Sequence, residues 1–225
     1  MTTEERHPSA DYLEALYELI EEDLPPVQAE LGRWMAVSRA SVSEHVKRLV
    51  ADGLLETIGR DLRFTRKGRA LAVTLVRRHR LAEHLLIDVI GLPWHEAHVY
   101  AERWERVIDG EIEERLVTLL ADPGACPHGN PIPGSANEVD VSSLVALADV
   151  APGTTVVLRR LTEDVELELG VMRFLEESRL MPGATIRVRT SAPDGTLTLD
   201  TDGTTSALGP DLADHLWVEG VDRAT

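Results

Sequence analysis

Apolar side chains recur at helical spacing in three segments near the start of the chain. Residues 10–23 carry such a stripe and predict a first helix, with Ser9 as its cap. The prolines after Leu24 end that helix, since proline cannot continue it. Residues 27–34 predict a short second helix, and residues 41–52 a third that Gly53 ends. The positions that define the first and third stripes are Tyr12, Leu13, Leu16, Ile20, Val42, Val46, Leu49 and Val50.

Two short runs of alternating polarity follow these helices. Residues 54–58 and 62–65 alternate as strands do, and Gly59-Arg60-Asp61 between them is typical of a turn. Two short helices around a tight turn, followed by a two-stranded hairpin, are typical of a winged helix-turn-helix. We therefore predict a DNA-binding winged domain over residues 1–73. Such modules also serve as protein-protein scaffolds, and that alternative stays open here.

The remainder of the chain changes its pattern twice. Helical stretches at 69–91 and 94–120 carry more apolar surface than a small winged domain can bury, which predicts a helical metal-binding and dimerisation domain over 74–140. Residues 141–150 predict a linker. Short strands at 155–158, 185–188 and 196–199 surround a helix near 167–175, which predicts an SH3-like β-barrel over 151–225. The expected fold class is mainly α with a C-terminal β domain.

Net charge is distributed unevenly along the 225 residues. The formal charge is −16, yet residues 33–80 carry twelve basic and only four acidic side chains. The field at a binding surface is set by charges within a Debye length of about 8–10 Å, so a basic segment in an acidic chain can still bind phosphates. A solvated helix face explains the charge alone equally well, but its coincidence with the winged pattern favours DNA.

Composition also restricts the compartment and the class of partner. A single cysteine, Cys126, excludes a disulfide scaffold within one chain, and we expect it to be incidental. The first residues lack the pattern of a secretory signal, and no run approaches the roughly 18 apolar residues of a membrane span. We expect a cytoplasmic protein without a membrane partner or a small-molecule substrate.

The candidate DNA-binding residues divide by role. Ser41 and Ser43 are expected to contact phosphates, and Arg60 and Arg63 in the hairpin to add positive charge independent of sequence. Base reading is assigned to the start of the third helix, where a glutamate can accept a hydrogen bond from the cytosine amino group. The other members of the predicted interface are Ser38, Arg39, Glu44, Lys47 and Arg48.

Three groups of potential metal ligands lie on predicted helices. His79 and Glu83 stand at i,i+4, so both project from one face. His98, Glu102 and Glu105 share a face of the next stretch, and Asp11 and Glu14 share one in the first helix. Any single pair of this kind is more often an ion pair. Together they supply many oxygens, two imidazoles and no thiolate, which favours Mn²⁺ or Fe²⁺ over Zn²⁺ or Cu⁺.

Three longer motifs resemble those of the diphtheria-toxin-repressor family of metal-dependent transcriptional regulators. They are VRRHRLAEHLLIDVIGL at Val76–Leu92, HVYAERWE at His98–Glu105 and HGNPIPG at His128–Gly134. The likeness covers nearly the whole chain and implies the family's three-domain form. It therefore implies a homodimer on double-stranded operator DNA, with two metal sites per subunit.

The resemblance also implies ligand sets. His79, Glu83 and His98 match the ancillary site of iron-responsive members, with Glu168 as the third-domain ligand, whereas the neighbouring amide position holds Val171, which cannot ligate. At the primary site, carboxylates replace the methionine and cysteine of iron-responsive members, which matches the manganese-responsive branch. These residues are Asp11, Glu14, Glu102 and Glu105, with His79 as a further candidate. The family's next histidine is Arg106 here, and a guanidinium cannot bind a metal.

From these residues we predict a metal-dependent repressor of metal-homeostasis genes that is activated by Mn²⁺, and not an enzyme. An iron-responsive repressor of the same architecture is the first alternative. A metal-dependent hydrolase is disfavoured because the chain has no HExxH, no nucleophile elbow and no glycine-rich phosphate loop. A metal-binding interaction protein that no longer binds DNA is a third possibility, against which the basic segment argues.

Overall fold

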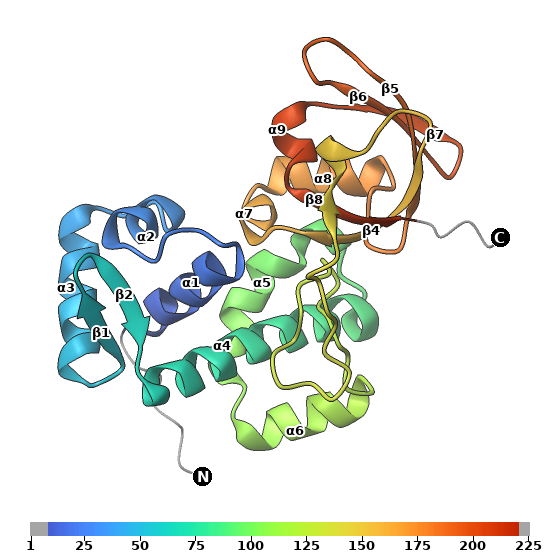
Figure 1. The fold of residues 1–225 in the computed structure, drawn as a ribbon. Coiled ribbons are helices and arrows are strands. Elements are labelled where there is room, and N and C mark those ends of the chain that lie inside the picture. The colour runs from blue at the N-terminus through green and yellow to red at the C-terminus, as the bar shows by residue number, and fades with distance from the viewer. Residues whose placement is uncertain (1–8, 221–225) are drawn as a thin grey trace.

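Residues 9–220 are described by a computed structural model, in which three bodies pack around one long helix (Figure 1). The first eight and last five residues, which belong to the predicted first and third domains, lie outside the described part. The long helix α4 runs from Arg66 to His84 and passes from the DNA-binding region into the centre of the molecule. It therefore connects the predicted winged domain to the candidate metal ligands.

The first body is a winged helix-turn-helix, as the pattern predicts. Three helices precede a two-stranded hairpin, and most of their apolar positions form one core closed by the start of α4, whereas Ile20 and Val50 of the predicted stripes are exposed. Gly68 is required at that contact, because a Cβ there would lie 1.8 Å from the carbonyl oxygen of Leu54. The elements are α1 (Ala10–Glu21), α2 (Gln28–Trp34), α3 (Arg39–Ala51), β1 (Leu55–Ile58) and β2 (Asp61–Phe64).

The middle body differs from the single second helix expected over 94–120. Helix α4 continues as a π-helical segment, Leu85–Ile90, and the next stretch is divided into α5 (Ala97–Trp104) and α6 (Gly110–Leu119) with a short 3-10 turn between them. The break occurs because the Asp109 side chain accepts a hydrogen bond from the Ile112 amide at 3.0 Å, which starts a new helix. This local cap overrides the continuous apolar spacing.

The third body is an antiparallel sheet with helices packed on it, in the strand order β3-β8-β4-β5-β6-β7. Its edge strand β3 falls inside the predicted linker, and Leu147, just after it, is fully buried in the sheet core. The C-terminal domain therefore begins before residue 151. Its elements are β3 (Val145–Ala146), β4 (Thr155–Leu161), α7 (Glu163–Glu166), α8 (Leu169–Glu177), β5 (Thr185–Ser191), β6 (Leu197–Thr201), β7 (Thr204–Leu208), α9 (Pro210–Ala213) and β8 (Leu216–Gly220).

The third body is anchored to the middle one by an apolar and a backbone contact. Trp94, just before α5, is buried in the core of the sheet domain, and its indole donates to the Pro127 carbonyl at 3.0 Å. Gly129 packs so tightly on β4 that a Cβ would lie 2.0 Å from the Arg159 carbonyl oxygen. The Leu161 amide donates to the His128 carbonyl at 2.9 Å. The HGNPIPG run is thereby held against β4.

No helix within residues 9–220 has the length and apolarity that crossing a membrane requires.

Candidate metal centre

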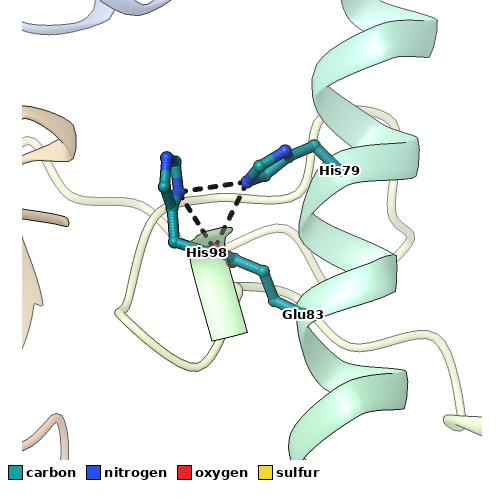
Figure 2. Close-up of side chains that lie close together, drawn as sticks. All are labelled: His79, Glu83 and His98. Atoms are coloured by element: carbon teal, nitrogen blue, oxygen red, sulfur yellow. Dashed lines mark hydrogen bonds and ion pairs between the residues drawn. The ribbon is translucent and has the colours of Figure 1, made fainter. Parts of the chain in front are cut away.

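His79 and Glu83 project from one face of α4, as their spacing predicts, and His98 faces them from α5 (Figure 2). The three reactive atoms form a small triangle. His79 Nε2 lies 3.2 Å from His98 Nδ1, and each of these nitrogens lies 3.4 Å from Glu83 Oε1. All three side chains are buried. The predicted ancillary ligands are therefore brought together in the interior of the molecule.

Two further buried residues complete this group, and sequence reasoning missed both. His128 Nδ1 lies 3.3 Å from Glu83 Oε1 and 2.8 Å from Glu166 Oε2, and Glu166 Oε2 lies 3.3 Å from His98 Nδ1. His128 comes from the HGNPIPG run and Glu166 from α7 of the sheet domain. We call His79, Glu83, His98, His128 and Glu166 the histidine cluster. The motif was the only sequence signal for His128, and nothing in the pattern singles out Glu166.

The predicted third-domain residue is in a different place. Glu168 lies at the residue before α8 without a capping side-chain hydrogen bond, is exposed, and belongs to none of the groups of possible ligands found among the described residues. Glu163 and Glu166, on the preceding short helix α7, lie near His98 instead. The structure brings Glu166, and not the predicted Glu168, close to the histidines, because α7 faces α5.

Cys126 lies beside the histidine cluster. Its sulfur belongs with Glu83 and His128 to a group whose potential ligand atoms all lie within 4.8 Å of one another. Burial, with Glu83 and Glu166 nearby, raises the pKa of the Cys126 thiol to about 12. Cys126 is therefore part of the surroundings of the centre, where we expected an incidental linker residue, and it is protonated at neutral pH without a cation beside it.

Neighbouring carboxylates favour the protonated form of each imidazole in the histidine cluster. Burial opposes protonation of His98, but Glu166 and Glu83 outweigh it and raise the pKa of His98 to about 10. Burial likewise opposes protonation of His79 and His128, yet neighbouring carboxylates hold the pKa of each well above its usual value. Burial alone raises the pKa of Glu83, but His128 and its neighbours bring it well below the usual range.

A second group lies on the other side of His79. His79 Nδ1 is 2.6 Å from Glu105 Oε2 and 4.0 Å from Glu14 Oε1, and all three residues are buried. We call Glu14 and Glu105, with Asp11 and Glu102, the carboxylate cluster. Asp11 and Glu102 are exposed at its outer edge, and both line the same cavity as the buried pair. His79 therefore faces its own histidine cluster with Nε2 and contacts the carboxylate cluster with Nδ1.

The cavity beside the carboxylate cluster has a volume of about 410 Å³ and is bordered by all three bodies. Arg106 also lines it, and its NH2 group lies 3.8 Å from Asp11 Oδ2, with both side chains about half exposed. Its Nε donates to the Glu102 carbonyl oxygen at 3.0 Å. Arg106 therefore supplies a fixed positive charge at the position where the resemblance leads us to expect a histidine.

The donor sets suit a divalent cation. With bonds of about 2.1 Å, neighbouring ligand atoms are separated by about 3.0 Å in octahedral and about 3.4 Å in tetrahedral geometry. The His79, Glu83 and His98 atoms are separated by 3.2–3.4 Å. The Glu105 carboxylate accepts from Nδ1 of His79, so loss of the Nε2 proton leaves that nitrogen available as a ligand. A divalent cation can replace the protons that now neutralise these carboxylates.

The predicted DNA-binding residues lie on α3 and on the hairpin. The Ser38 hydroxyl caps α3 by accepting from the Ser41 amide at 3.2 Å, and Arg48 is paired with Glu44 at 3.0 Å. The Ser41 hydroxyl is also bonded to the Tyr12 hydroxyl at 2.6 Å, which ties α3 to α1. The predicted residues that are exposed are Arg39, Glu44, Lys47, Arg60 and Arg63, with Ser38.

Comparison with known proteins covers all three bodies. Residues 7–61 match the model described as "Iron dependent repressor, N-terminal DNA binding domain", residues 65–134 match "Iron dependent repressor, metal binding and dimerisation domain", and residues 145–220 match the FeoA domain. The iron-dependent repressor IdeR of Mycobacterium tuberculosis is 40% identical over 221 residues, which is 93% of this chain and 96% of that protein. The chain belongs to the iron-dependent repressor family.

Two other proteins extend the comparison. The diphtheria toxin repressor of Corynebacterium diphtheriae is 35% identical over 220 residues, which is 92% of this chain and 95% of that protein. A solved structure described as a manganese-dependent transcriptional repressor in complex with manganese has a TM-score of 0.82 at 27% identity, over 95% of this chain and all of that one. The expected family and fold class are thus confirmed.

Membership of the iron-dependent repressor family determines the general class of function. Metal-dependent DNA-binding repressors make up this family, so the chain is placed with transcriptional regulators and not with enzymes. The matched DNA-binding domain and dimerisation domain indicate operator DNA and a second copy of the chain as partners. The relatives include both iron-dependent and manganese-dependent proteins, so the family alone leaves the choice of metal open.

Proposed function

We propose that this chain represses metal-homeostasis genes in response to Mn²⁺, with one ion at the carboxylate cluster and one at the histidine cluster of each subunit. The observation that supports this most directly is the position of His79. Its two ring nitrogens face Glu105 on one side and Glu83 with His98 on the other. The two clusters therefore meet at His79 on α4, beside the helix α1 of the DNA-binding domain.

The choice of Mn²⁺ rests on the chemistry of the carboxylate cluster. Asp11, Glu14, Glu102 and Glu105 offer only hard oxygen atoms, and the cavity that they line contains no cysteine, its one sulfur being the thioether of Met35. Carboxylate oxygens suit Mn²⁺, whereas sulfur ligands favour softer ions. The alternative is Fe²⁺, which the similarity to the iron-dependent repressor IdeR of Mycobacterium tuberculosis favours.

The residues couple the metal to DNA through α1. Asp11 and Glu14 project from α1, whereas Glu102 and Glu105 project from α5 and the turn after it. A bound divalent cation supplies the positive charge that offsets repulsion among these carboxylates. When they are held together, α1 is fixed against the middle body, and the Tyr12–Ser41 bond carries that position to α3. Two recognition helices in a dimer then keep one spacing.

Metal titration of operator binding tests this function. We expect Mn²⁺ to raise the affinity of the full chain for its operator by roughly 5- to 150-fold, the usual range of allosteric coupling. The operator is a duplex that the protein selects from a random library in the presence of Mn²⁺. Affinity is measured by fluorescence anisotropy at fixed ionic strength, with Fe²⁺ titrated anaerobically in parallel. Stimulation by Fe²⁺ at lower free concentration than Mn²⁺ would identify an iron-responsive repressor instead.

Glu44 gives a separate test on the DNA side. Its carboxylate is exposed on α3 and paired with Arg48, where it can accept a hydrogen bond from a cytosine amino group. We expect Glu44→Gln to change the ranking of operator variants with single base substitutions, by about 1–3 kcal/mol at the position that Glu44 reads. Arg63→Gln in the hairpin is the comparison, since it should weaken all variants alike. An unchanged ranking in Glu44→Gln would show that Glu44 does not read a base.

A further inference from the structure

A network of buried charges joins the sheet domain to the end of α1. Arg80 on α4 is only 1% exposed, and its guanidinium donates to both carboxylate oxygens of Glu21, the last residue of α1. The same guanidinium donates through Nε to Glu163 of α7 at 3.2 Å and to the Pro131 carbonyl oxygen. One side chain thus holds three segments from the three bodies together.

A second arginine makes a parallel connection. Arg160 on β4 is 4% exposed and donates to Glu22, the residue that follows α1. Glu22 also accepts from the Glu163 amide at 3.3 Å. Nε of Arg160 donates to the Asn130 side chain at 2.5 Å, and Asn130 donates to Glu166 at 2.7 Å. A continuous series of contacts therefore runs from the histidine cluster to the end of α1.

These contacts are unlike ordinary surface ion pairs. The side chains of Arg160 and Glu22 are 5% and 7% exposed, so little water competes with their interaction. In contrast, the neighbouring residue Arg159 pairs with Glu219 at 2.8 Å with both side chains about half exposed. Breaking a buried pair leaves an uncompensated charge, whereas an exposed pair contributes little.

The segment after α1 links the C-terminal end of that helix to α2 and to the hairpin. Asp23 takes a left-handed conformation at φ 55°, and Leu24-Pro25-Pro26 then leads directly into α2. The Leu62 amide donates to the Pro26 carbonyl oxygen at 2.7 Å, which ties this segment to the wing. A shift at the end of α1 therefore displaces α2 and the hairpin together.

We propose that the sheet domain restrains the DNA-binding domain through these buried contacts of Arg80, Arg160 and Glu163 with the end of α1, which we call the clasp. Through Arg160 and Glu163 it holds the C-terminal end of α1, whose N-terminal part carries Asp11 and Glu14 of the carboxylate cluster. Glu166, a member of the histidine cluster, lies on the short helix α7 together with Glu163. Metal occupancy of that cluster therefore sets how firmly α1 is held. Only this last step rests on the proposed function; the clasp itself is a property of the fold.

Glu22→Ala tests the clasp, because Glu22 lies outside both clusters. Hydrogen exchange of the metal-free full chain is measured first. We expect faster exchange of the amides in residues 17–24 and 159–163 of Glu22→Ala than in wild type. The control is Glu219→Ala, which removes from β8 the exposed partner of Arg159, and it should exchange as wild type does. Glu22→Leu, which fills much of the same volume but offers no acceptor to Arg160, gives the same comparison if the alanine variant does not fold. Unaltered exchange in a folded Glu22 variant would overturn the clasp.

The second measurement adds metal and operator. We expect Glu22→Ala to take up as many Mn²⁺ ions as wild type by calorimetry, and to lose about tenfold of the Mn²⁺ stimulation of operator affinity. Full stimulation in this variant would show that the clasp does not contribute to DNA binding. If wild type takes up no Mn²⁺, the proposed function fails, while the exchange comparison in metal-free protein still decides whether the clasp exists.

Discussion

Replacement of Arg80 by methionine is expected to lower the free energy of unfolding by about 3–5 kcal/mol. Methionine keeps much of the volume of the arginine stem but leaves the carboxylates of Glu21 and Glu163 without their cation, and Glu163 is itself buried. The Pro131 carbonyl oxygen also loses a donor. Urea unfolding of the metal-free protein, followed by circular dichroism and tryptophan fluorescence, measures the change.

Arg115→Met is the matched control for Arg80. Arg115 pairs with Glu111 at 2.8 Å on α6, but both side chains are 76% exposed. An exposed pair four residues apart in a helix contributes about 0.3–0.5 kcal/mol. The two substitutions remove the same group and differ in burial. Equal costs for both would mean that burial of the Arg80 network adds nothing to stability.

Replacement of Glu105 by alanine is expected to abolish the stimulation of operator binding by Mn²⁺. Glu105 is 5% exposed and holds His79 Nδ1 at 2.6 Å, so its removal takes a ligand from the carboxylate cluster and frees the imidazole ring. The expected loss is the whole coupling, about 1–3 kcal/mol. Calorimetry should show one fewer Mn²⁺ ion per subunit, and anisotropy with the selected operator should show equal affinity with and without metal.

Two further variants test whether the loss of Mn²⁺ stimulation comes from the carboxylate cluster. Glu114→Ala on α6 removes an exposed carboxylate outside both clusters and should keep full stimulation. Glu102→Ala should lose stimulation as Glu105→Ala does, because Glu102 lines the same cavity from α5. Undiminished stimulation in Glu105→Ala and Glu102→Ala would show that the carboxylates do not hold α1 through the metal.

Arg106 distinguishes this chain from the family's common pattern. Its guanidinium lies at the outer edge of the carboxylate cluster, near Asp11, and donates to the Glu102 carbonyl. A fixed positive charge there offsets part of the repulsion among the carboxylates. It takes the place of a neutral ligand, so the primary site in our proposal is built from the four carboxylates, with His79 held beside them by Glu105.

Local rules account for the parts of the fold that lie close together in the sequence. The helices α1 and α3, the hairpin and the Gly53 turn depend on neighbouring residues and are present in the structure, although Ile20, Val50 and Ile58 of the predicted apolar positions are exposed. The i,i+4 relation of His79 and Glu83 follows from helical geometry alone. The same rules were wrong over 94–120, where the Asp109 cap ends one helix and starts another.

Contacts between bodies depend on packing that no local pattern encodes. Glu166 enters the histidine cluster, and Glu168 does not, because Trp94 and Gly129 dock the sheet domain so that α7 faces α5. His128 and Arg80 are buried by the same docking, and a hydrophilic residue gives no sign in the sequence that the interior will enclose it. Periodicity therefore determined the helices and their ligand-bearing faces. The tertiary structure alone decided which charges meet, because desolvation and ion pairing act between segments that are distant in the chain.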